Sequence, residues 1–119
     1  SGVQCIIACV SVGLGAWRAL IRKAAWSAPL GGFPDAELAA RAKILPAETA
    51  IKVTNDALQI HGAMGYSRNL DLERKVRDAR MFPIAGGTAQ ILRTQVAGAI
   101  LGIRTPQSRD GYLRLASGE

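Results

Sequence analysis

A continuous apolar seam along the first part of the sequence constrains the fold more than any other feature. Over residues 3–28, apolar side chains recur at alternating steps of four and three, which places them on one face of an α-helix. The residues of this seam are Val3, Ile7, Val10, Leu14, Trp17, Ile21, Ala24 and Ala28. No segment shows the alternation with period two that is typical of strands. We therefore expect an all-α protein.

A second helix is predicted from Asp35 or Ala36 to about Ala63, after a loop at residues 29–34 with two prolines and two glycines. Two apolar stripes on neighbouring faces indicate a helix packed on two sides, in the middle of a bundle. One stripe contains Ala40, Ile44, Ala47, Ile51, Thr54 and Leu58; the other contains Ala50, Val53, Ala57, Ile60 and Met64. Pro46 lacks a backbone donor, so we expect a kink or a split near residues 44–45.

Two further helices follow. A short one is predicted over about residues 70–80, capped by Asn69 or Asp71, with ion pairs Asp71/Lys75, Glu73/Arg77 and Arg74/Asp78. The last helix is predicted from Thr88, its N-cap, to Ile103, and should bury Leu92, Val96, Ala99 and Ile103. Together these elements predict an up-and-down helical bundle over residues 1–104, incomplete in this chain, and a flexible tail over residues 105–119.

Charge and composition limit the partners. The net charge of +6 at pH 7 suits nucleic acid, an anionic membrane or a polyanionic ligand such as a nucleotide cofactor. On charge alone, a solvated basic surface is the favoured interpretation. Within the basic stretch at residues 71–80, acids alternate with bases and no aromatic residue is present for stacking on nucleic-acid bases. We therefore expect no nucleic-acid partner.

The cysteines and the N-terminal apolar run suggest a compartment. Cys5 and Cys9 lie four residues apart, a poor geometry for a disulfide and too few ligands for zinc. We interpret them as buried small hydrophobes in a reducing compartment, the cytoplasm or, in a eukaryote, the mitochondrial matrix. The weakly charged run at residues 3–17 is too short to span a bilayer, so we expect no transmembrane segment. No basic region precedes this run, so we expect no signal peptide. The chain lacks an initiator methionine, and we expect it to begin inside a longer protein.

Three ordered motifs carry a family resemblance. They are Q-x-x-G-x-x-G-Y at residues 59–66, E-R-x-x-R-D-A-R at 73–80 and G-T-x-Q-I-x-R at 87–93. With them, residues 3–103 resemble the C-terminal helical domain of the flavin-dependent acyl-CoA dehydrogenases. The resemblance implies FAD as cofactor, α,β-dehydrogenation of an acyl-CoA thioester, and assembly as a homo- or hetero-oligomer. It also implies another long helix and two preceding domains, so this chain alone should be inactive.

The resemblance assigns roles to individual residues. Those matching Gln59, His61, Gly62 and Ala63 touch the adenine-nucleotide end of a flavin held mainly by a neighbouring subunit. Those matching Thr88 and Gln90 also approach FAD, and Gly86 and Gly87 fall at the substrate. Spacing alone favours ordinary helix caps, whereas the ordered motifs favour the cofactor. We expect Gln59 and Thr88 to border one surface crevice.

His61 and the charged residues of the short helix have simpler interpretations. His61 has no nearby nucleophile, so we expect it to be structural and to bond a backbone carbonyl rather than to act in catalysis. The segment matching Glu73, Arg77 and Asp78 is structural in the family, and we interpret these three residues as a packing network.

Position 86 departs from the family pattern. Many members have a glutamate there as the base that removes the α-proton, and Gly86 cannot serve this role. Members resembling isovaleryl-CoA dehydrogenase carry the base on an earlier helix, and in two-gene assemblies one subunit lacks it. We assign no catalytic residue to this chain. The alternatives are a non-catalytic subunit or fragment, a related flavin monooxygenase or oxidase, and a stand-alone helical interaction or nucleic-acid-binding module.

Overall fold

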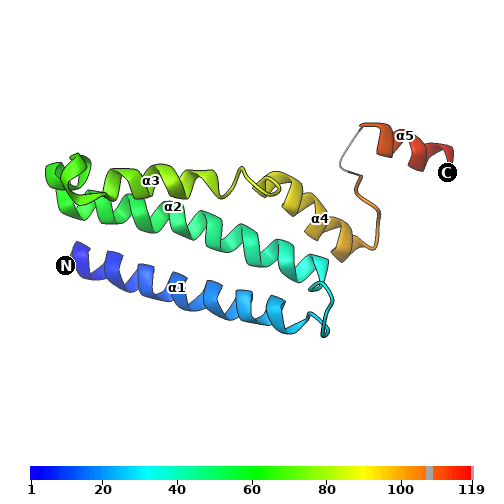
Figure 1. The fold of residues 1–119 in the computed structure, drawn as a ribbon, viewed down its shortest axis with the longest axis horizontal. Helices are drawn as coiled ribbons and strands as arrows, with labels where there is room; N and C mark the ends of the chain where they lie inside the picture. Colours follow the sequence, from blue (N-terminus) through cyan, green and yellow to red (C-terminus); the bar gives the residue numbers. More distant parts are fainter. Residues whose placement is uncertain (107–108, 119) are drawn as a thin grey trace.

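The protein is helical throughout the part that the computed structural model describes, residues 1–106 and 109–118 (Figure 1). No strand occurs among these residues, which confirms the all-α prediction. The α-helices are α1 (Gly2–Trp26), α2 (Ala36–Tyr66), α3 (Leu72–Met81), α4 (Ala89–Leu101) and α5 (Arg109–Ser117), and a 3₁₀ turn, η1 (Arg68–Leu70), precedes α3.

Helix α2 is the centre of the fold. Helix α1 packs antiparallel against one side of it, and α3 and α4 pack against the other side (Figure 1). The α1–α2 connection is held by Ser27, whose hydroxyl donates to the Ala24 carbonyl at 2.6 Å and accepts from the Asp35 amide at 2.9 Å. Asp35 then caps α2 by accepting from the Leu38 amide at 2.9 Å. The two apolar stripes of the second helix therefore predicted its central place correctly.

Helix α1 extends well beyond the weakly charged run at residues 3–17. Ser1 caps it in a reciprocal arrangement with Gln4, and the helix continues for 25 residues. By length and composition alone it could cross a membrane, so the argument that this segment is too short for a span is wrong. The same test is passed by core helices of bundles, and α1 packs along α2 in this fold.

The interruption in α2 lies at Gly62 and not at Pro46. The helix is not split near residues 44–45, and Gly62 is the residue inside it with non-helical angles, φ 57° and ψ −137°. After this break one more turn continues to Tyr66, with Gly65 buried inside it. A Cβ on Gly65 would lie 2.6 Å from the Leu58 carbonyl oxygen, so close approach of the backbone requires glycine there.

Helix α3 begins two residues later than predicted. Asp71 is its N-cap in a left-handed conformation, but its carboxylate makes no capping hydrogen bond and pairs with Arg74 at 3.0 Å. The predicted Glu73–Arg77 pair is present at 3.0 Å. In the described part of the chain, Asp71/Lys75 and Arg74/Asp78 are not ion pairs. The packing network therefore reduces to Glu73 and Arg77, and such exposed pairs each contribute only about 0–1 kcal/mol.

The core of this chain is small. Its buried hydrophobic residues are Ala24, Ala40, Ala47, Ala79 and Ala89. The radius of gyration is 18.2 Å, whereas a compact chain of this length would have about 13.5 Å. In this elongated shape Val3 and Ile7, at the N-terminal end of the seam, are exposed, and so are Cys5 and Cys9, contrary to prediction. Among the described helices α1 packs only against α2, which leaves these side chains open to solvent even where, as at Cys9, they line a pocket shared with α2.

The C-terminal region also differs in detail. Helix α4 ends at Leu101 with Gly102 as a left-handed C-cap, and it buries Ala89 and Gly98. Ile103, which we expected to be buried, is 57% exposed, and Ala99 is exposed too. Helix α5 lies in the segment predicted as a tail and packs against none of the other described helices. The division of the chain at residues 104 and 105 stays a prediction.

Candidate functional site

The turn between α3 and α4 contains two consecutive residues with positive φ. Gly86 and Gly87 have φ values of 67° and 95°, a region that side chains disfavour. The amide of Ala89 closes the turn by donating to the Pro83 carbonyl at 3.0 Å. The two glycines therefore allow the chain to reverse tightly and to start α4 immediately afterwards.

Thr88 is the N-cap of α4, as predicted. Its hydroxyl oxygen accepts from the Ile91 amide at 3.2 Å, which satisfies one of the unpaired N–H groups of the first turn. Gln90, two residues after Thr88, is exposed. Among the described residues, no hydrogen bond uses the N–H groups of Gly86, Gly87 or Thr88. The turn therefore presents free donors to whatever binds in front of it.

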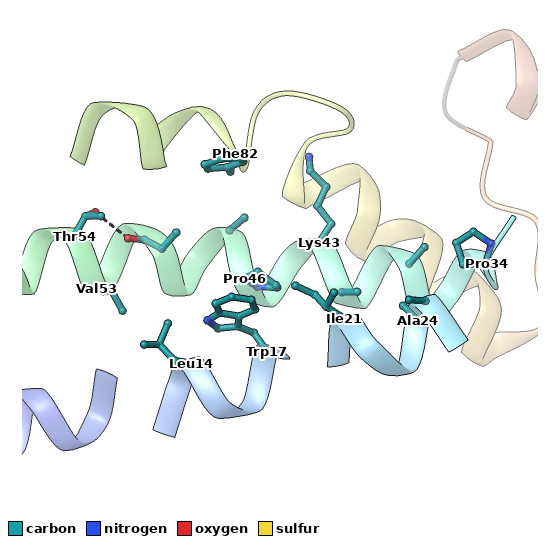
Figure 2. Close-up of a pocket in the computed structure, with 15 residues that line it drawn as sticks. Leu14, Trp17, Ile21, Ala24, Pro34, Lys43, Pro46, Val53, Thr54 and Phe82 are labelled. Carbon is teal, nitrogen blue, oxygen red and sulfur yellow. Dashed lines mark hydrogen bonds between the residues drawn. The ribbon is translucent and has the colours of Figure 1, made fainter. Parts of the chain in front are cut away.

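Lys43 holds this turn from α2. Its ammonium donates to the carbonyl oxygen of Gly87 at 2.6 Å and also to the carbonyl oxygen of Ala85. Figure 2 shows its side chain extending from α2 toward the loop between α3 and α4, away from Trp17 and Ile21. One side chain thus links two carbonyl groups that flank Gly86 to a helix more than forty residues earlier in the sequence.

A second long-range link fixes the direction of α4. Arg93 on α4 forms an ion pair with Glu48 on α2, in addition to the packing between these helices. Glu48 lies five residues after Lys43 on the same helix. The turn and the first two turns of α4 are therefore both attached to one short stretch of α2.

The other predicted site residues lie near the C-terminal end of α2. Gln59, His61, Gly62 and Ala63 are all exposed. The Nδ1 atom of His61 is 2.8 Å from the Ala57 carbonyl oxygen, so this histidine bonds a backbone carbonyl, as predicted. A Cβ on Gly62 would meet no atom within 4 Å. This end of the helix therefore offers an open stretch of backbone beside an exposed glutamine.

Within one chain, the structure does not bring the predicted site residues at the end of α2 together with those at the Gly86–Gly87 turn. Lys43 marks the place on α2 that faces the Gly86–Gly87 turn. Gln59 lies sixteen residues further along the same helix, which at 1.5 Å per residue is about 24 Å. The prediction that Gln59 and Thr88 border one crevice is therefore wrong for a single chain. Sequence motifs order the residues along the chain and contain no information on this separation.

A large apolar groove runs between α1 and α2 on the other side of the Lys43 stem. Its volume is about 710 Å³, and Figure 2 shows Leu14, Trp17 and Ile21 entering it from α1. From α2 the groove is lined by Pro46, Val53 and other mostly small residues. Because the Lys43 ammonium is directed to the turn, the groove walls are almost entirely apolar.

Comparison with known proteins agrees with this arrangement. The family described as "Acyl-CoA dehydrogenase, C-terminal domain" matches residues 2–101. The chain belongs to the acyl-CoA dehydrogenase family. The matched residues include α2 and all the helices that pack around it, and the match confirms the resemblance carried by the three motifs.

Two curated relatives are named 3-sulfinopropanoyl-CoA desulfinase. The protein from Variovorax paradoxus is 60% identical over 116 residues, which are 98% of this chain and 29% of that protein. The protein from Advenella mimigardefordensis is 60% identical over 115 residues, 97% of this chain and 28% of that protein. The chain thus spans less than a third of the length of these relatives.

A solved structure has the same fold. A chain in the structure described as an electron-transferring flavoprotein of Acidaminococcus fermentans is 35% identical, with a TM-score of 0.79. The match covers 84% of the present chain and 26% of that chain. The family and this flavoprotein neighbour together imply the use of a flavin.

Sequence reasoning missed Lys43 as a site residue. The available signal is a single lysine inside an apolar stripe, in register with Ala39, Ala50 and Val53. A charged residue on a face that packs against other helices needs a partner. The sequence could have raised this question, but it could not name two carbonyl groups as the answer.

Proposed function

We propose that the protein containing this chain is a FAD-dependent enzyme that acts on the acyl part of a CoA thioester. The turn at Gly86 and Gly87 would face the acyl group, and the exposed end of α2 would face the nucleotide part of a flavin. The family match supports this assignment, and so does the exposure of Gln59, Gly62 and Gln90 in the first and third motifs. This chain would supply the helical core, a subunit interface and one edge of the flavin site.

The residues present fit the edge of a bound nucleotide. Gly62 leaves open space where any other residue would place a Cβ, and the Gln59 side chain beside it is exposed. At the other end of α2, the N-terminal turn of α4 offers N–H groups that suit an anionic or polarised oxygen. Gln59, His61, Gly62 and Ala63 would hold the adenine-nucleotide end, with Thr88 and Gln90 at a second contact. When bound, FAD would supply an acceptor for hydride if the reaction is a dehydrogenation.

Two reactions are candidates. The first is α,β-dehydrogenation, which requires a base for the α-proton of the acyl thioester. The second is removal of a sulfinate group from carbon 3 of the acyl chain. Its overall balance is R–CH₂–SO₂⁻ + H₂O → R–CH₃ + HSO₃⁻, in which the carbon–sulfur bond breaks, carbon 3 gains hydrogen and sulfur gains oxygen. Both hydrogens on the α-carbon remain in the product.

We favour desulfination because of what surrounds Gly86. Position 86 provides no carboxylate, and the nearest side-chain atom to a Cβ built there is the Lys43 ammonium nitrogen, at 3.8 Å. A cationic neighbour does not act as a base for the α-proton. Both relatives described above, each at 60% identity, are desulfinases by name, which supports the same choice.

The test compares the two reactions in the intact protein. Purified protein with FAD is given 3-sulfinopropanoyl-CoA, and sulfite and the propanoyl thioester are measured by mass spectrometry. In parallel it is given butanoyl-CoA and an electron-accepting dye. We expect sulfite release without dye reduction. Dye reduction without sulfite release would favour dehydrogenation, and neither reaction together with no FAD binding would refute the proposed function.

A further inference from the structure

Lys43 has an unusual set of partners for a lysine. Its side chain is half-buried, and in the part of the chain that the structure describes it forms no ion pair. Lys52, nine residues further along α2, has a side chain that is 64% exposed and pairs with Asp56 at 2.5 Å. The Lys43 ammonium instead bonds the carbonyl groups of Ala85 and Gly87. A charged group that bonds only backbone is well placed to set the orientation of that backbone.

The peptide geometry gives these two bonds a further consequence. The described chain contains no cis peptide bond, and in a trans peptide the C=O and N–H groups point in opposite directions. The Ala85 carbonyl shares its peptide with the Gly86 N–H, and the Gly87 carbonyl shares its peptide with the Thr88 N–H. Because Lys43 draws both carbonyls toward α2, both N–H groups point away from α2.

We propose that Lys43 is a positioning residue that aims the N–H groups of Gly86 and Thr88 at an oxygen of the bound acyl thioester. This rests on the proposed function, since it takes the turn as the part of the site that faces the ligand. Two glycines with positive φ would otherwise allow the turn many conformations. Lys43 selects the conformation in which the donors are free and directed outward. Donors held in this way stabilise charge on oxygen without reorganisation during the reaction.

The decisive substitution is Lys43→Met in the intact protein, because methionine keeps an unbranched apolar stem and removes the three donors. Lys43→Arg retains donors for the two carbonyls and serves as the conservative variant. Lys52→Met is the matched control, since it removes a lysine from the same helix without touching the turn. Each variant is measured for kcat, KM, FAD content and melting temperature. Hydrogen exchange of the peptide covering residues 83–92 is measured without ligand.

For Lys43→Met we expect kcat to fall by about 10- to 100-fold, with FAD content unchanged, since one oriented donor is worth at least this much. We also expect faster exchange of the Ala89 and Ile91 amides, which are bonded within the turn and the first turn of α4. Lys43→Arg should recover most of both properties, and Lys52→Met should match the parent.

Several results separate this inference from the proposed function. If the parent neither binds FAD nor acts on acyl-CoA, the proposed function fails, but faster exchange in Lys43→Met still supports the hold on the turn. Unchanged kcat and unchanged exchange in Lys43→Met would overturn the inference. An equal loss in Lys52→Met would do the same. If Lys43→Met does not fold, Lys43→Arg decides: parent-like exchange and kcat support the inference, and parent-like exchange with a lost kcat contradicts it.

Discussion

Replacing Gly62 by alanine should destabilise the last turn of α2, even though the new methyl group would touch nothing. Gly62 has φ 57° and ψ −137°, a combination that residues with a Cβ rarely adopt. No atom lies within 4 Å of the position of the Cβ, so the change neither creates a clash nor adds packing. The cost is therefore backbone strain alone, about 1–3 kcal/mol.

Two other glycines make the comparison informative. Gly15 also has open space around its Cβ position, but it lies within α1 at an ordinary helical φ. Gly15→Ala should stabilise α1 by about 0.5–1 kcal/mol, because alanine loses less backbone entropy on folding. Gly65→Ala should cost more than Gly62→Ala, since its Cβ would lie 2.6 Å from the backbone oxygen of Leu58. The three substitutions thus differ in sign and in size for separate reasons.

The assay is native-state hydrogen exchange of the intact protein, because a multidomain protein does not give one free energy of unfolding. The Ser67 amide, which donates to the Ala63 carbonyl at 3.1 Å, reports on the last turn of α2. Gly62→Ala should speed its exchange roughly 5- to 150-fold, the equivalent of 1–3 kcal/mol. Unchanged or slower exchange would refute the claim that Gly62 holds this conformation in solution.

Three more predictions concern the cap of α4, the flavin contact and the oligomeric state. Thr88→Ala should destabilise the start of α4 by about 1 kcal/mol without flavin, and Thr88→Ser should not, because serine keeps the capping oxygen; equal melting temperatures of the two flavin-free variants would contradict this. Gln59→Ala should weaken FAD binding roughly 10- to 100-fold in the intact enzyme, while Asn55→Ala, one turn earlier and also exposed, should leave the affinity unchanged. The 119-residue chain by itself should form a dimer or tetramer through α1 and α4, since Ile7, Val12, Ile100 and Leu101 are exposed. A monomer at every concentration tested by sedimentation would argue against this prediction.

The sequence predicted the local structure of this chain well. Apolar spacing over three or four residues reports which face of a helix is covered, and it placed α2 between its neighbours. The cap at Thr88 and the carbonyl bond of His61 were also predictable, because both join residues within one helical turn. The family could be identified from three short motifs in order, since each motif is contiguous in sequence.

Spacing was less informative about burial at the ends of the helices. Val3, Ile7 and Ile103 have the right chemistry and register for a core, yet all three are exposed. Periodicity identifies the face that needs a partner, and it does not show whether the chain contains that partner.

Only the tertiary structure decided which distant groups meet. Lys43 reaches the Gly86–Gly87 turn across more than forty residues because α3 reverses along α2 and ends opposite it. Gln59 lies about 24 Å from that place along α2. The residues that the family resemblance assigns to a flavin are therefore far apart within one chain. By itself the sequence determines helices, caps and register, since these depend on neighbours within four residues. Contacts between helices depend on loop geometry and packing, which no local pattern contains.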